Sequence, residues 1–360
     1  MVDTNTAPYS LGNAERREFL SRELSELMLF HYDNCEIYRN ILDGFGKAPR
    51  RDGSITDYKE IPFIPVRLFK EYELLSTDRE NIVKSVTSSG TTGQKVSKIF
   101  LDRETAAAQT KVLTKIVSDF IGTSRLPMII MDSPSVIRNR AMFSARGAGI
   151  LGFQIFGRDK FFALDDEMKL DIDGLSAFLE KHKGERILIF GFTFMIWQHF
   201  CEVLRENGCR PDLSQAVMIH GGGWKKLADK KISHDTFHSV LNEVCGISSI
   251  HDYYGMAEQT GTIYMECECG HIHSSIYSDI IIRKPEDFSE CAVGEEGIIQ
   301  TLSLLPHSYP GFSLLTEDKG ILLGEDDCPC GRKGRYFRII GRMKNAEIRG
   351  CSDTYADKFR

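Results

Sequence analysis

An alternation of short apolar runs with longer amphipathic stretches, between residues 104 and 245, constrains the fold more than any other feature of the sequence. The apolar runs, at 127–131, 187–190 and 216–219, are short enough to be strands and apolar enough to be buried on both faces. Helical patterns lie before, between and after them, at 104–120, 173–183, 195–206 and 234–245. This order predicts an α/β domain in which helices flank buried mixed sheets.

The sequence on either side of this region predicts different structure. Residues 1–45 have a helical pattern, and Asn13 can cap the helix. Its apolar stripe consists of Phe19, Leu20, Leu24, Leu27, Met28 and Phe30. Residues 61–69 (IPFIPVRLF) hold two prolines, so we expect an extended segment there. Residues 292–340 contain β-like runs separated by glycines, which predicts a β-rich subdomain.

Length and composition indicate an enzyme-sized globular protein. A chain of 360 residues suits one large or two ordinary domains, and 42% apolar with 27% charged residues is typical of soluble proteins. A net charge of −6 argues against a general nucleic-acid or membrane-surface binder. The longest apolar run, 187–201, is too short to span a membrane, and the N-terminal residues lack an apolar signal core. We therefore expect a cytoplasmic protein without a membrane span.

The ten cysteines suit a reducing compartment as thiols or metal ligands, because a chain of this size needs no disulfides. Two short Cys-x-Cys-Gly motifs, in CECGHIH (267–273) and CPCGRKG (328–334), can meet as a tetrahedral Zn²⁺ site. Symmetry selects Cys267, Cys269, Cys328 and Cys330, and His271 is a further candidate. Four protein ligands leave no open position, so the role would be structural. Buried thiols without metal are the alternative.

A cluster of small donors at residues 88–95 (SSGTTGQK) is the first candidate phosphate site. Glycines let backbone N–H groups approach an anion, and hydroxyls and a lysine add donors and charge. The spacing differs from the Walker P-loop, because Gly90 and Gly93 are three residues apart and Val96 follows Lys95. A polar surface turn is the alternative.

Two of the strand-like segments run into unusual sequence. The run at 216–219 continues into HGGGWKK, and SSIHDYY (248–254) continues into GMAEQTG. Since open α/β sheets bind ligands at the carboxyl ends of their strands, both segments are candidates for a binding site.

Five motifs, in order along the chain, resemble those of the adenylate-forming superfamily, which includes acyl-CoA synthetases and peptide-synthetase adenylation domains. They are TSSGTTGQK (87–95), GGGW (221–224), YGMAE (254–258), LLTED (314–318) and GRMKNAEIRG (341–350). Two depart from the superfamily pattern. Glu317 replaces the usual glycine of the fourth motif, and the fifth, the hinge motif, is one residue short.

The resemblance implies activation of a carboxylic acid by ATP, with loss of pyrophosphate. Thr91, Thr92 and Lys95 would donate to the leaving phosphates, and Glu258 would hold Mg²⁺, which needs hard oxygen ligands. A solvated loop carboxylate is the alternative for Glu258. Asp318 would accept hydrogen bonds from the ribose hydroxyls. The implied nucleotide-binding residues are Ser88, Ser89, Gly90, Thr91, Thr92, Gly93, Gly222, Gly223, Tyr254, Gly255, Asp318 and Arg342.

The same resemblance offers a second ligand set for zinc. Phenylacetate-type ligases of the superfamily suggest a Cys-x5-His pair on the first segment, which would exchange Cys269 for His273. The four ligands therefore remain open among Cys267, Cys269, His273, Cys328 and Cys330.

One branch matches most fully, the acyl-protein synthetase family of the bacterial luciferase system. The chain ends shortly after Arg342, which implies an adenylate-forming domain (1–340) and a hinge with a short tail (341–360) in place of the superfamily's C-terminal domain. In that family a cysteine near the C-terminus receives the acyl group, here Cys351, and passes it to a partner reductase or transferase. The expected acid is a long-chain fatty acid.

Three alternatives to an acyl-protein synthetase that works through Cys351 remain open. Cys351 could be an incidental thiol. The chain could be a phenylacetate-type ligase that transfers the acyl group to CoA. It could also be a nucleotide-binding protein without activity, against which the presence of Lys95, Glu258 and Asp318 counts.

Overall fold

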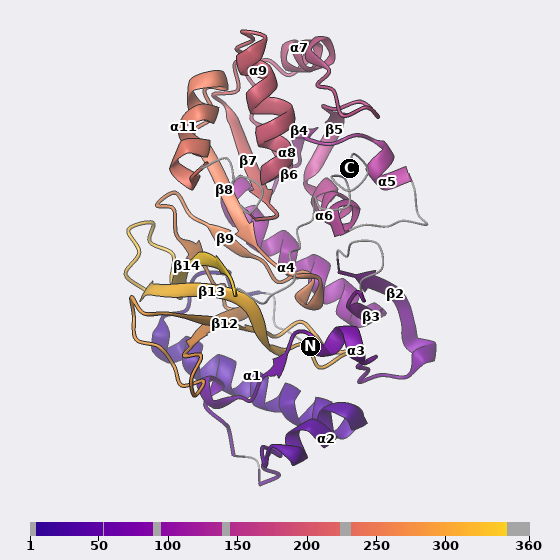
Figure 1. Ribbon diagram of the computed structural model, residues 1–360, viewed down its shortest axis with the longest axis vertical. Coiled ribbons are helices and arrows are strands. Elements are labelled where there is room, and N and C mark those ends of the chain that lie inside the picture. Colours follow the sequence, from indigo (N-terminus) through magenta and orange to yellow (C-terminus); the bar gives the residue numbers. More distant parts are fainter. Residues whose placement is uncertain (1–4, 53, 89–94, 139–144, 224–231, 344–360) are drawn as a thin grey trace. The chain divides into compact units, whose positions relative to one another are not determined.

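The computed structural model describes residues 5–52, 54–88, 95–138, 145–223 and 232–343 (Figure 1). These residues form two compact units. Unit 1 takes in 5–88, 95–119 and 255–343, and unit 2 takes in 120–254. The tail after residue 343, with Cys351, lies outside the described residues.

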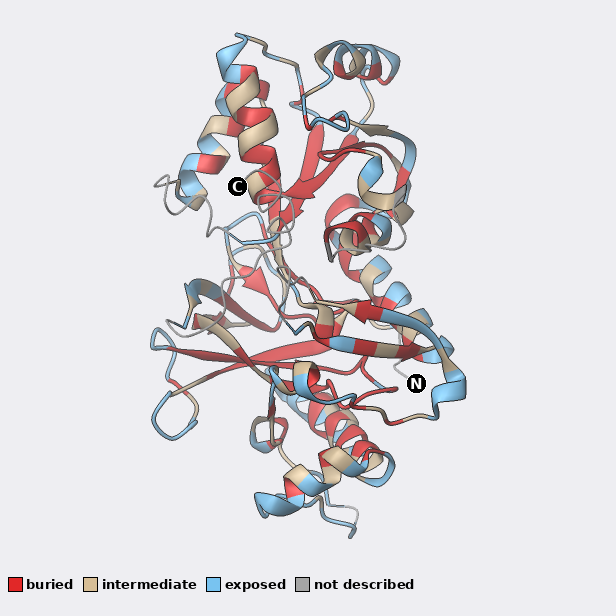
Figure 2. Cartoon of the chain, turned by 45° about the vertical axis from the view of Figure 1, so that its right-hand side comes forward, coloured by how far each residue is buried: buried red, intermediate tan, exposed pale blue. Residues whose placement is uncertain are grey.

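Unit 2 contains a parallel sheet with the strand order β5-β4-β6-β7-β8. The strands are β4 (Leu126–Ile130), β5 (Gly157–Phe162), β6 (Ile187–Phe192), β7 (Ala216–Gly221) and β8 (Ser249–Tyr254). β6 and β7 are buried at every position, as the red strands of Figure 2 show. The three strands predicted from apolar runs are confirmed as β4, β6 and β7. Their apolar runs are continuous because helices cover both faces of such a strand, which leaves no polar side.

The helices of unit 2 also follow the predicted pattern, with one irregularity. They are α5 (Ser135–Arg138), α6 (Ala145–Phe153), α7 (Ile172–Lys181), α8 (Thr193–Ile196), α9 (Glu202–Glu206) and α11 (His234–Cys245), with a 3₁₀ turn, η4 (Gln154–Phe156). The predicted helix at 195–206 contains a π-helical turn, η5 (Trp197–Cys201). Ser233 caps α11 by accepting from the Thr236 amide, and Gly246, at φ 75°, ends it.

Unit 1 contains the predicted β-rich part. Its strands lie in the order β11-β12-β13-β14-β10-β9, and all neighbours are antiparallel. They are β9 (Tyr264–Glu266), β10 (Ile272–His273), β11 (Ser278–Arg283), β12 (Glu296–Ser303), β13 (Ser313–Glu325) and β14 (Arg335–Arg342). β1 (Ile64–Pro65) adds a parallel pairing to β13, and β2 (Ile82–Thr87) and β3 (Lys98–Asp102) form a separate hairpin.

The N-terminal helices confirm the predicted stripe but not the predicted cap. They are α1 (Asn13–Asn34), α2 (Glu36–Gly44) and α3 (Leu68–Glu71), with 3₁₀ turns η1 (Tyr58–Glu60) and η2 (Arg79–Asn81). Leu20, Leu24, Leu27 and Met28 are buried. The N-cap is Gly12 instead of Asn13, and the Asn13 amide donates to Asp326 at 2.7 Å. The extended segment predicted at 61–69 ends before Leu68, where α3 begins.

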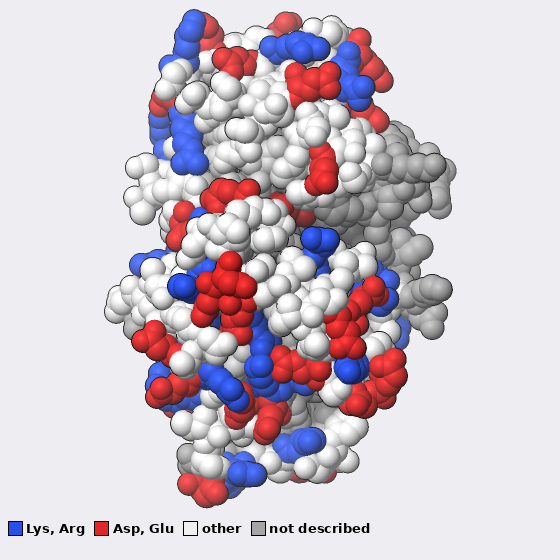
Figure 3. Space-filling model, turned by 90° about the vertical axis from the view of Figure 1, so that its left-hand side faces the viewer, with Lys and Arg blue, Asp and Glu red and all other residues white. Residues whose placement is uncertain are grey.

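A further long helix is α4 (Arg103–Ile121). Asp102 accepts from the Thr105 amide at 2.8 Å and so caps its start. No helix in the described ranges is long and apolar enough to cross a membrane. On the face drawn in Figure 3, basic and acidic side chains of the described residues are interspersed.

Candidate active site and metal centre

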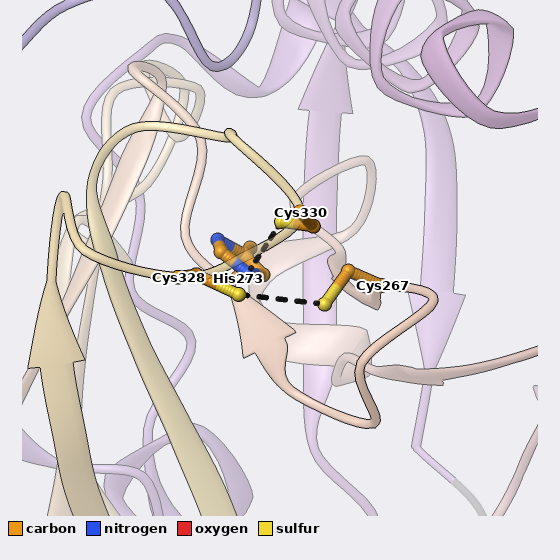
Figure 4. A group of neighbouring side chains, drawn as sticks. All are labelled: Cys267, His273, Cys328 and Cys330. Carbon is orange, nitrogen blue, oxygen red and sulfur yellow. Dashed lines mark hydrogen bonds between the residues drawn. The ribbon is translucent and has the colours of Figure 1, made fainter.

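Four side chains that bind metals in other proteins converge in unit 1. They belong to Cys267, His273, Cys328 and Cys330, and their ligand atoms all lie within 4.8 Å of one another (Figure 4). The sulfur atoms of Cys267 and Cys328 are 3.8 Å apart, and Sγ of Cys330 is 3.5 Å from Nε2 of His273. Three sulfurs and one imidazole at such distances suit tetrahedral zinc.

Strand pairing brings the four side chains together. β9 and β10 form a short antiparallel pair, and the turn between them closes where the Cys267 amide donates to the His271 carbonyl at 2.8 Å. β10 also pairs with β14, so that His273 lies opposite Tyr336. Cys328 and Cys330 precede β14 in a turn that Gly331 completes at φ 82°. The two cysteine motifs therefore meet because their flanking strands are neighbours.

The structure distinguishes between the two ligand sets that the sequence left open. His273 is fully buried and faces the cysteines, whereas Cys269 is exposed and lies outside the group. His271 contacts the group from the side, with Nδ1 3.2 Å from Sγ of Cys328. The geometry thus brings together the set with His273.

Burial sets the protonation of the group in the absence of metal. It raises the pKa of the Cys267 and Cys328 thiols, and it lowers the pKa of His273 to about 4. His273 is therefore a neutral imidazole at pH 7, the form that binds metal ions. The thiols become thiolates only when a cation offsets the cost of burying their charge.

Arg332 supplies positive charge next to the cysteine motifs. Its Nη1 lies 2.7 Å from Glu268 and its Nε 2.9 Å from Asp119, at the end of α4. The guanidinium also lies over the ring of Tyr9, 5.7 Å from the centroid, and Tyr9 packs edge-on against His273. Neither residue was predicted from the sequence, because Tyr9 is remote from both cysteine motifs along the chain and Arg332, although it lies within CPCGRKG (328–334), is not a metal-ligand type.

Glu258, the predicted Mg²⁺ ligand, lies in a 3₁₀ turn, η6 (Ala257–Gln259), and is 7% exposed. The negative charge of the Glu258 carboxylate reaches the phenol of the buried Tyr309. Burial, with a contribution from the Glu258 charge, raises the pKa of Tyr309, so the phenol stays neutral. A buried carboxylate oxygen is a ligand of the hard type that Mg²⁺ prefers, and Glu258 therefore fits the predicted role.

Asp318 and Arg342 come from two different motifs and meet across neighbouring strands. They are opposite each other in the β13–β14 register, and Nε of Arg342 donates to Oδ1 of Asp318 at 2.9 Å. The carboxylate of Glu317, which replaces the usual glycine, pairs with Arg67 at 3.2 Å, and the backbone carbonyl of Glu317 accepts from the Met343 amide. Arg342 belongs to β14, so the predicted boundary at residue 340 falls inside this strand.

The ends of the candidate phosphate loop are described, and residues 89–94 are not. Ser88 and Ser97 close the base of the loop, because the Ser88 amide donates to the Ser97 carbonyl at 3.1 Å. The Ser97 amide in turn donates to the Ser88 hydroxyl at 2.9 Å. Lys95 is largely exposed and pairs with Glu71 at 2.5 Å. Ser89, Gly90, Thr91, Thr92 and Gly93 lie outside the described residues.

In unit 2, two glycines that the resemblance implied to bind the nucleotide follow β7. Gly222 and Gly223 have φ values of 98° and 76°, a backbone region that favours glycine. A Cβ on Gly222 would lie 2.8 Å from the ring of Phe192, so the position also lacks space for a side chain. Tyr254 ends β8, at the same edge of the parallel sheet as Gly221 of β7. Gly255, the next residue of its motif, belongs to unit 1 and is exposed.

Comparison with solved structures identifies the class that this fold defines. The chain superposes on an open conformation of 2-hydroxyisobutyryl-CoA ligase in complex with 2-HIB-AMP and CoA, with a TM-score of 0.73. The match covers 97% of this chain and 81% of the other, at 17% sequence identity. At that identity the likeness establishes the fold, which is that of adenylate-forming ligases.

A family model narrows the class. The model described as "Acyl-protein synthetase, LuxE" matches residues 2–360, and the chain belongs to this family. It is 23% identical over 361 residues to a long-chain-fatty-acid–luciferin-component ligase of Vibrio harveyi, over 98% of this chain and 91% of the relative. It is 22% identical to a phenylacetate-coenzyme A ligase of Thermus thermophilus, over 94% of this chain and 73% of the relative. The protein is a ligase of the adenylate-forming type.

Proposed function

We propose that the protein activates a long-chain fatty acid with ATP and then carries the acyl group on Cys351. In the first step a carboxylate oxygen attacks the α-phosphorus of ATP, the bond to the β-phosphate breaks, and acyl-AMP and pyrophosphate form. Membership of the acyl-protein synthetase family over residues 2–360 is the observation that carries this proposal. The relative in Vibrio harveyi supports the choice of acid, since its name includes a long-chain fatty acid.

The residues at the candidate site would mainly bind and orient ATP. Asp318, oriented by Arg342, would accept hydrogen bonds from the ribose hydroxyls, and Tyr254 would pack near the adenine. Lys95 would leave its exposed pairing with Glu71 to bind the departing phosphates. An exposed ion pair costs little to break, about 1 kcal/mol or less, so this exchange is readily accessible.

Glu258 would hold Mg²⁺, and the bound ion would offset the negative charge of the phosphates. The residue is buried within a 3₁₀ turn, which supports the assignment. Because catalysis of phosphoryl and adenylyl transfer depends on positioned charges, these residues would act mostly in the transition state.

In the second step the Cys351 thiolate would attack the acyl carbon of acyl-AMP, and AMP would leave. A thiolate is a better nucleophile toward an activated acyl group than a hydroxyl. The acyl thioester would then pass to a partner reductase or transferase. Cys351 lies outside the described residues, so the proposal for this step rests on the family and on the position of the cysteine.

The Cys267, His273, Cys328 and Cys330 group would bind one structural Zn²⁺. The donor set fits, because the four ligand atoms are within 4.8 Å of one another and His273 is neutral. Zinc would tie the β9–β10 turn to the segment before β14, and so stabilise the part of unit 1 that also contains Asp318. None of the nine described cysteines forms a disulfide, which is consistent with a reducing compartment such as the cytoplasm.

The second candidate function is transfer of the acyl group to CoA instead of to Cys351. It is favoured by the likeness to the phenylacetate-coenzyme A ligase. To separate the two functions, the protein is incubated with ATP, Mg²⁺ and radiolabelled palmitate, with and without CoA. A protein-bound label that hydroxylamine removes supports acyl-protein synthesis. AMP release that requires CoA, without protein-bound label, supports the CoA ligase instead.

A further inference from the structure

The turn that carries Glu258 is fixed by internal hydrogen bonds. The Thr262 amide donates to the Gln259 carbonyl at 3.0 Å, and Thr260 Oγ1 donates to the Ala257 carbonyl at 2.8 Å. Gln259 is 1% exposed. A buried, hydrogen-bonded turn has few alternative conformations, so the contacts of its backbone determine the position from which the Glu258 side chain extends.

The first neighbour of this turn is helix α4. Gly261 has a φ of 84°, a conformation that residues with a side chain rarely adopt. A Cβ on Gly261 would also lie 2.6 Å from Cβ, 2.7 Å from Cα and 2.8 Å from the carbonyl oxygen of Gln109. The turn therefore packs directly on the α4 backbone, which cannot move aside as a flexible side chain could.

The second neighbour is the segment at residues 309–311. Nε2 of Gln259 donates to the Gly311 carbonyl at 2.8 Å. A Cβ on Gly311 would lie 2.9 Å from the Glu258 carbonyl oxygen and 2.3 Å from Cε2 of Tyr309. The Tyr309 ring is fully buried and packs edge-on against Phe69, so it has no space to move away.

From these contacts we infer that Gln259, Gly261 and Gly311 are positioning residues that fix the Glu258 carboxylate for Mg²⁺ binding. The inference rests on the proposed role of Glu258 and extends it to residues outside the 254–258 motif. A ligand whose backbone is held on two sides loses little conformational freedom when the ion binds. Outer residues of this kind change metal affinity by about 10- to 100-fold when they are replaced.

Two substitutions test the inference, Gly311→Ala and Gln259→Met. The first adds a methyl group against the Glu258 carbonyl, and the second removes the hydrogen bond to Gly311 while keeping the side-chain length. Mn²⁺ is titrated into the full chain without any acid and with ATP held below the concentration of the chain, and the Mn²⁺ that ultrafiltration retains with the protein is measured by electron paramagnetic resonance. Both variants are expected to bind Mn²⁺ about tenfold more weakly than the unmodified chain. The Mg²⁺ concentration for half-maximal ATP–pyrophosphate exchange with palmitate is expected to rise by the same factor.

Gly297→Ala is the matched control for steric strain. A Cβ at Gly297 would lie 2.5 Å from the Arg283 carbonyl oxygen and 2.7 Å from Sγ of Cys291, in the β11–β12 part of the same unit. Both glycine variants should lower the melting temperature, but only Gly311→Ala should weaken Mn²⁺ binding. If Gly311→Ala does not fold, Gln259→Met decides the question.

Two outcomes separate this inference from the proposed function. If Glu258→Gln binds Mn²⁺ as tightly as the unmodified chain, Glu258 is not the metal ligand and its proposed role fails. If Glu258→Gln loses Mn²⁺ while folded Gly311→Ala and Gln259→Met bind it as tightly as Gly297→Ala, the positioning inference alone is overturned.

Discussion

Arg342 and Asp318 form an ion pair across the β13–β14 ladder, with Nε of Arg342 2.9 Å from Oδ1 of Asp318. Their side chains are 25% and 18% exposed, so the pair lies at the edge of the protein interior. Because Arg342 holds one oxygen of the carboxylate, it fixes the orientation in which Asp318 would meet a ribose. The pair thus joins the two motifs, at 314–318 and 341–350, that are proposed to contact the nucleotide.

Replacing Arg342 by glutamine is expected to weaken ATP binding without destabilising the protein. The KM for ATP in pyrophosphate exchange should rise by about three- to tenfold, because Asp318, the proposed ribose ligand, loses the arginine that orients it. A partly exposed pair contributes only about 1 kcal/mol or less to folding, so the melting temperature should barely change. Arg338→Gln, an exposed residue of the same strand, is the control. Equal KM values for the two variants would contradict the role of Arg342.

Lys95 is expected to act on the charge that develops as pyrophosphate leaves. Lys95→Ala should slow acyl-AMP formation by about tenfold or more, measured as pyrophosphate exchange at saturating ATP. Lys98→Ala is the control, because Lys98 is exposed and lies three residues further along the same segment, at the start of β3. An exchange rate for Lys95→Ala equal to that of Lys98→Ala would contradict the proposed role of Lys95 in pyrophosphate release.

The proposed zinc site predicts a difference between neighbouring cysteines. Purified protein should hold about one Zn²⁺ per chain, and Cys328→Ser or Cys330→Ser should lose zinc and lower the melting temperature, since metal binding contributes directly to folding. Cys269→Ser should keep both, because Cys269 lies outside the group. Metal analysis by mass spectrometry measures the zinc. Protein prepared without chelators that holds no zinc, or a Cys269→Ser variant that loses it, would refute this site.

The sequence identified the cysteine motifs, but it could not choose between Cys269 and His273. The choice depends on the pairing of β10 with β9 and β14, which turns His273 toward the cysteines. Strand pairing between distant segments leaves no local pattern in the sequence. The predicted cap at Asn13 was wrong for the same reason, since the partner of its amide, Asp326, is 313 residues away.

The elements of unit 2 were easier to predict, because the continuous apolar runs of buried strands and the periodicity of amphipathic helices are both local patterns. The π-helical turn at 197–201 was not predicted, since helical periodicity was read only for the whole 195–206 segment. Gly261 and Gly311 were also missed. A glycine in a turn has several possible causes, and only the structure shows which atoms occupy the space of its missing Cβ.

The burial of His31 leads to a prediction of how the stability of unit 1 depends on pH. The Pro306 carbonyl can only accept, so Nε2 of His31 donates to it at 3.1 Å, and Nδ1 accepts from the Ser76 hydroxyl at 2.7 Å. Burial lowers the pKa of His31 to about 3. Between this value and the ordinary pKa of about 6.5, the unfolded chain binds more protons than the folded chain. Stability should therefore fall as the pH falls through this window.

The contribution of His31 is measured by urea unfolding at pH 6.5 and pH 5.0. The linkage relation gives a loss of at most about 2 kcal/mol from this residue over that interval. His31→Gln should be less stable at both values but should lose less free energy of unfolding between them. Other buried histidines contribute equally to both proteins, so the difference between the two slopes isolates His31. Identical slopes would show that His31 is protonated as readily in the folded chain as in the unfolded chain.

Cys351 provides the test of acyl transfer. ATP, Mg²⁺ and a fatty acid should add one acyl group to the protein, seen by intact-protein mass spectrometry and removed by neutral hydroxylamine, which cleaves thioesters. Cys351→Ser should abolish this labile label and leave pyrophosphate exchange nearly intact, because adenylation precedes the transfer and does not involve the thiol. Cys209→Ser is the control, since Cys209 is a partly exposed thiol elsewhere in the chain. A labile acyl group that persists in Cys351→Ser, or that never maps to the peptide containing Cys351, would reject this cysteine as the acceptor. CoA-dependent release of AMP by the same protein would then make the CoA ligase the better assignment.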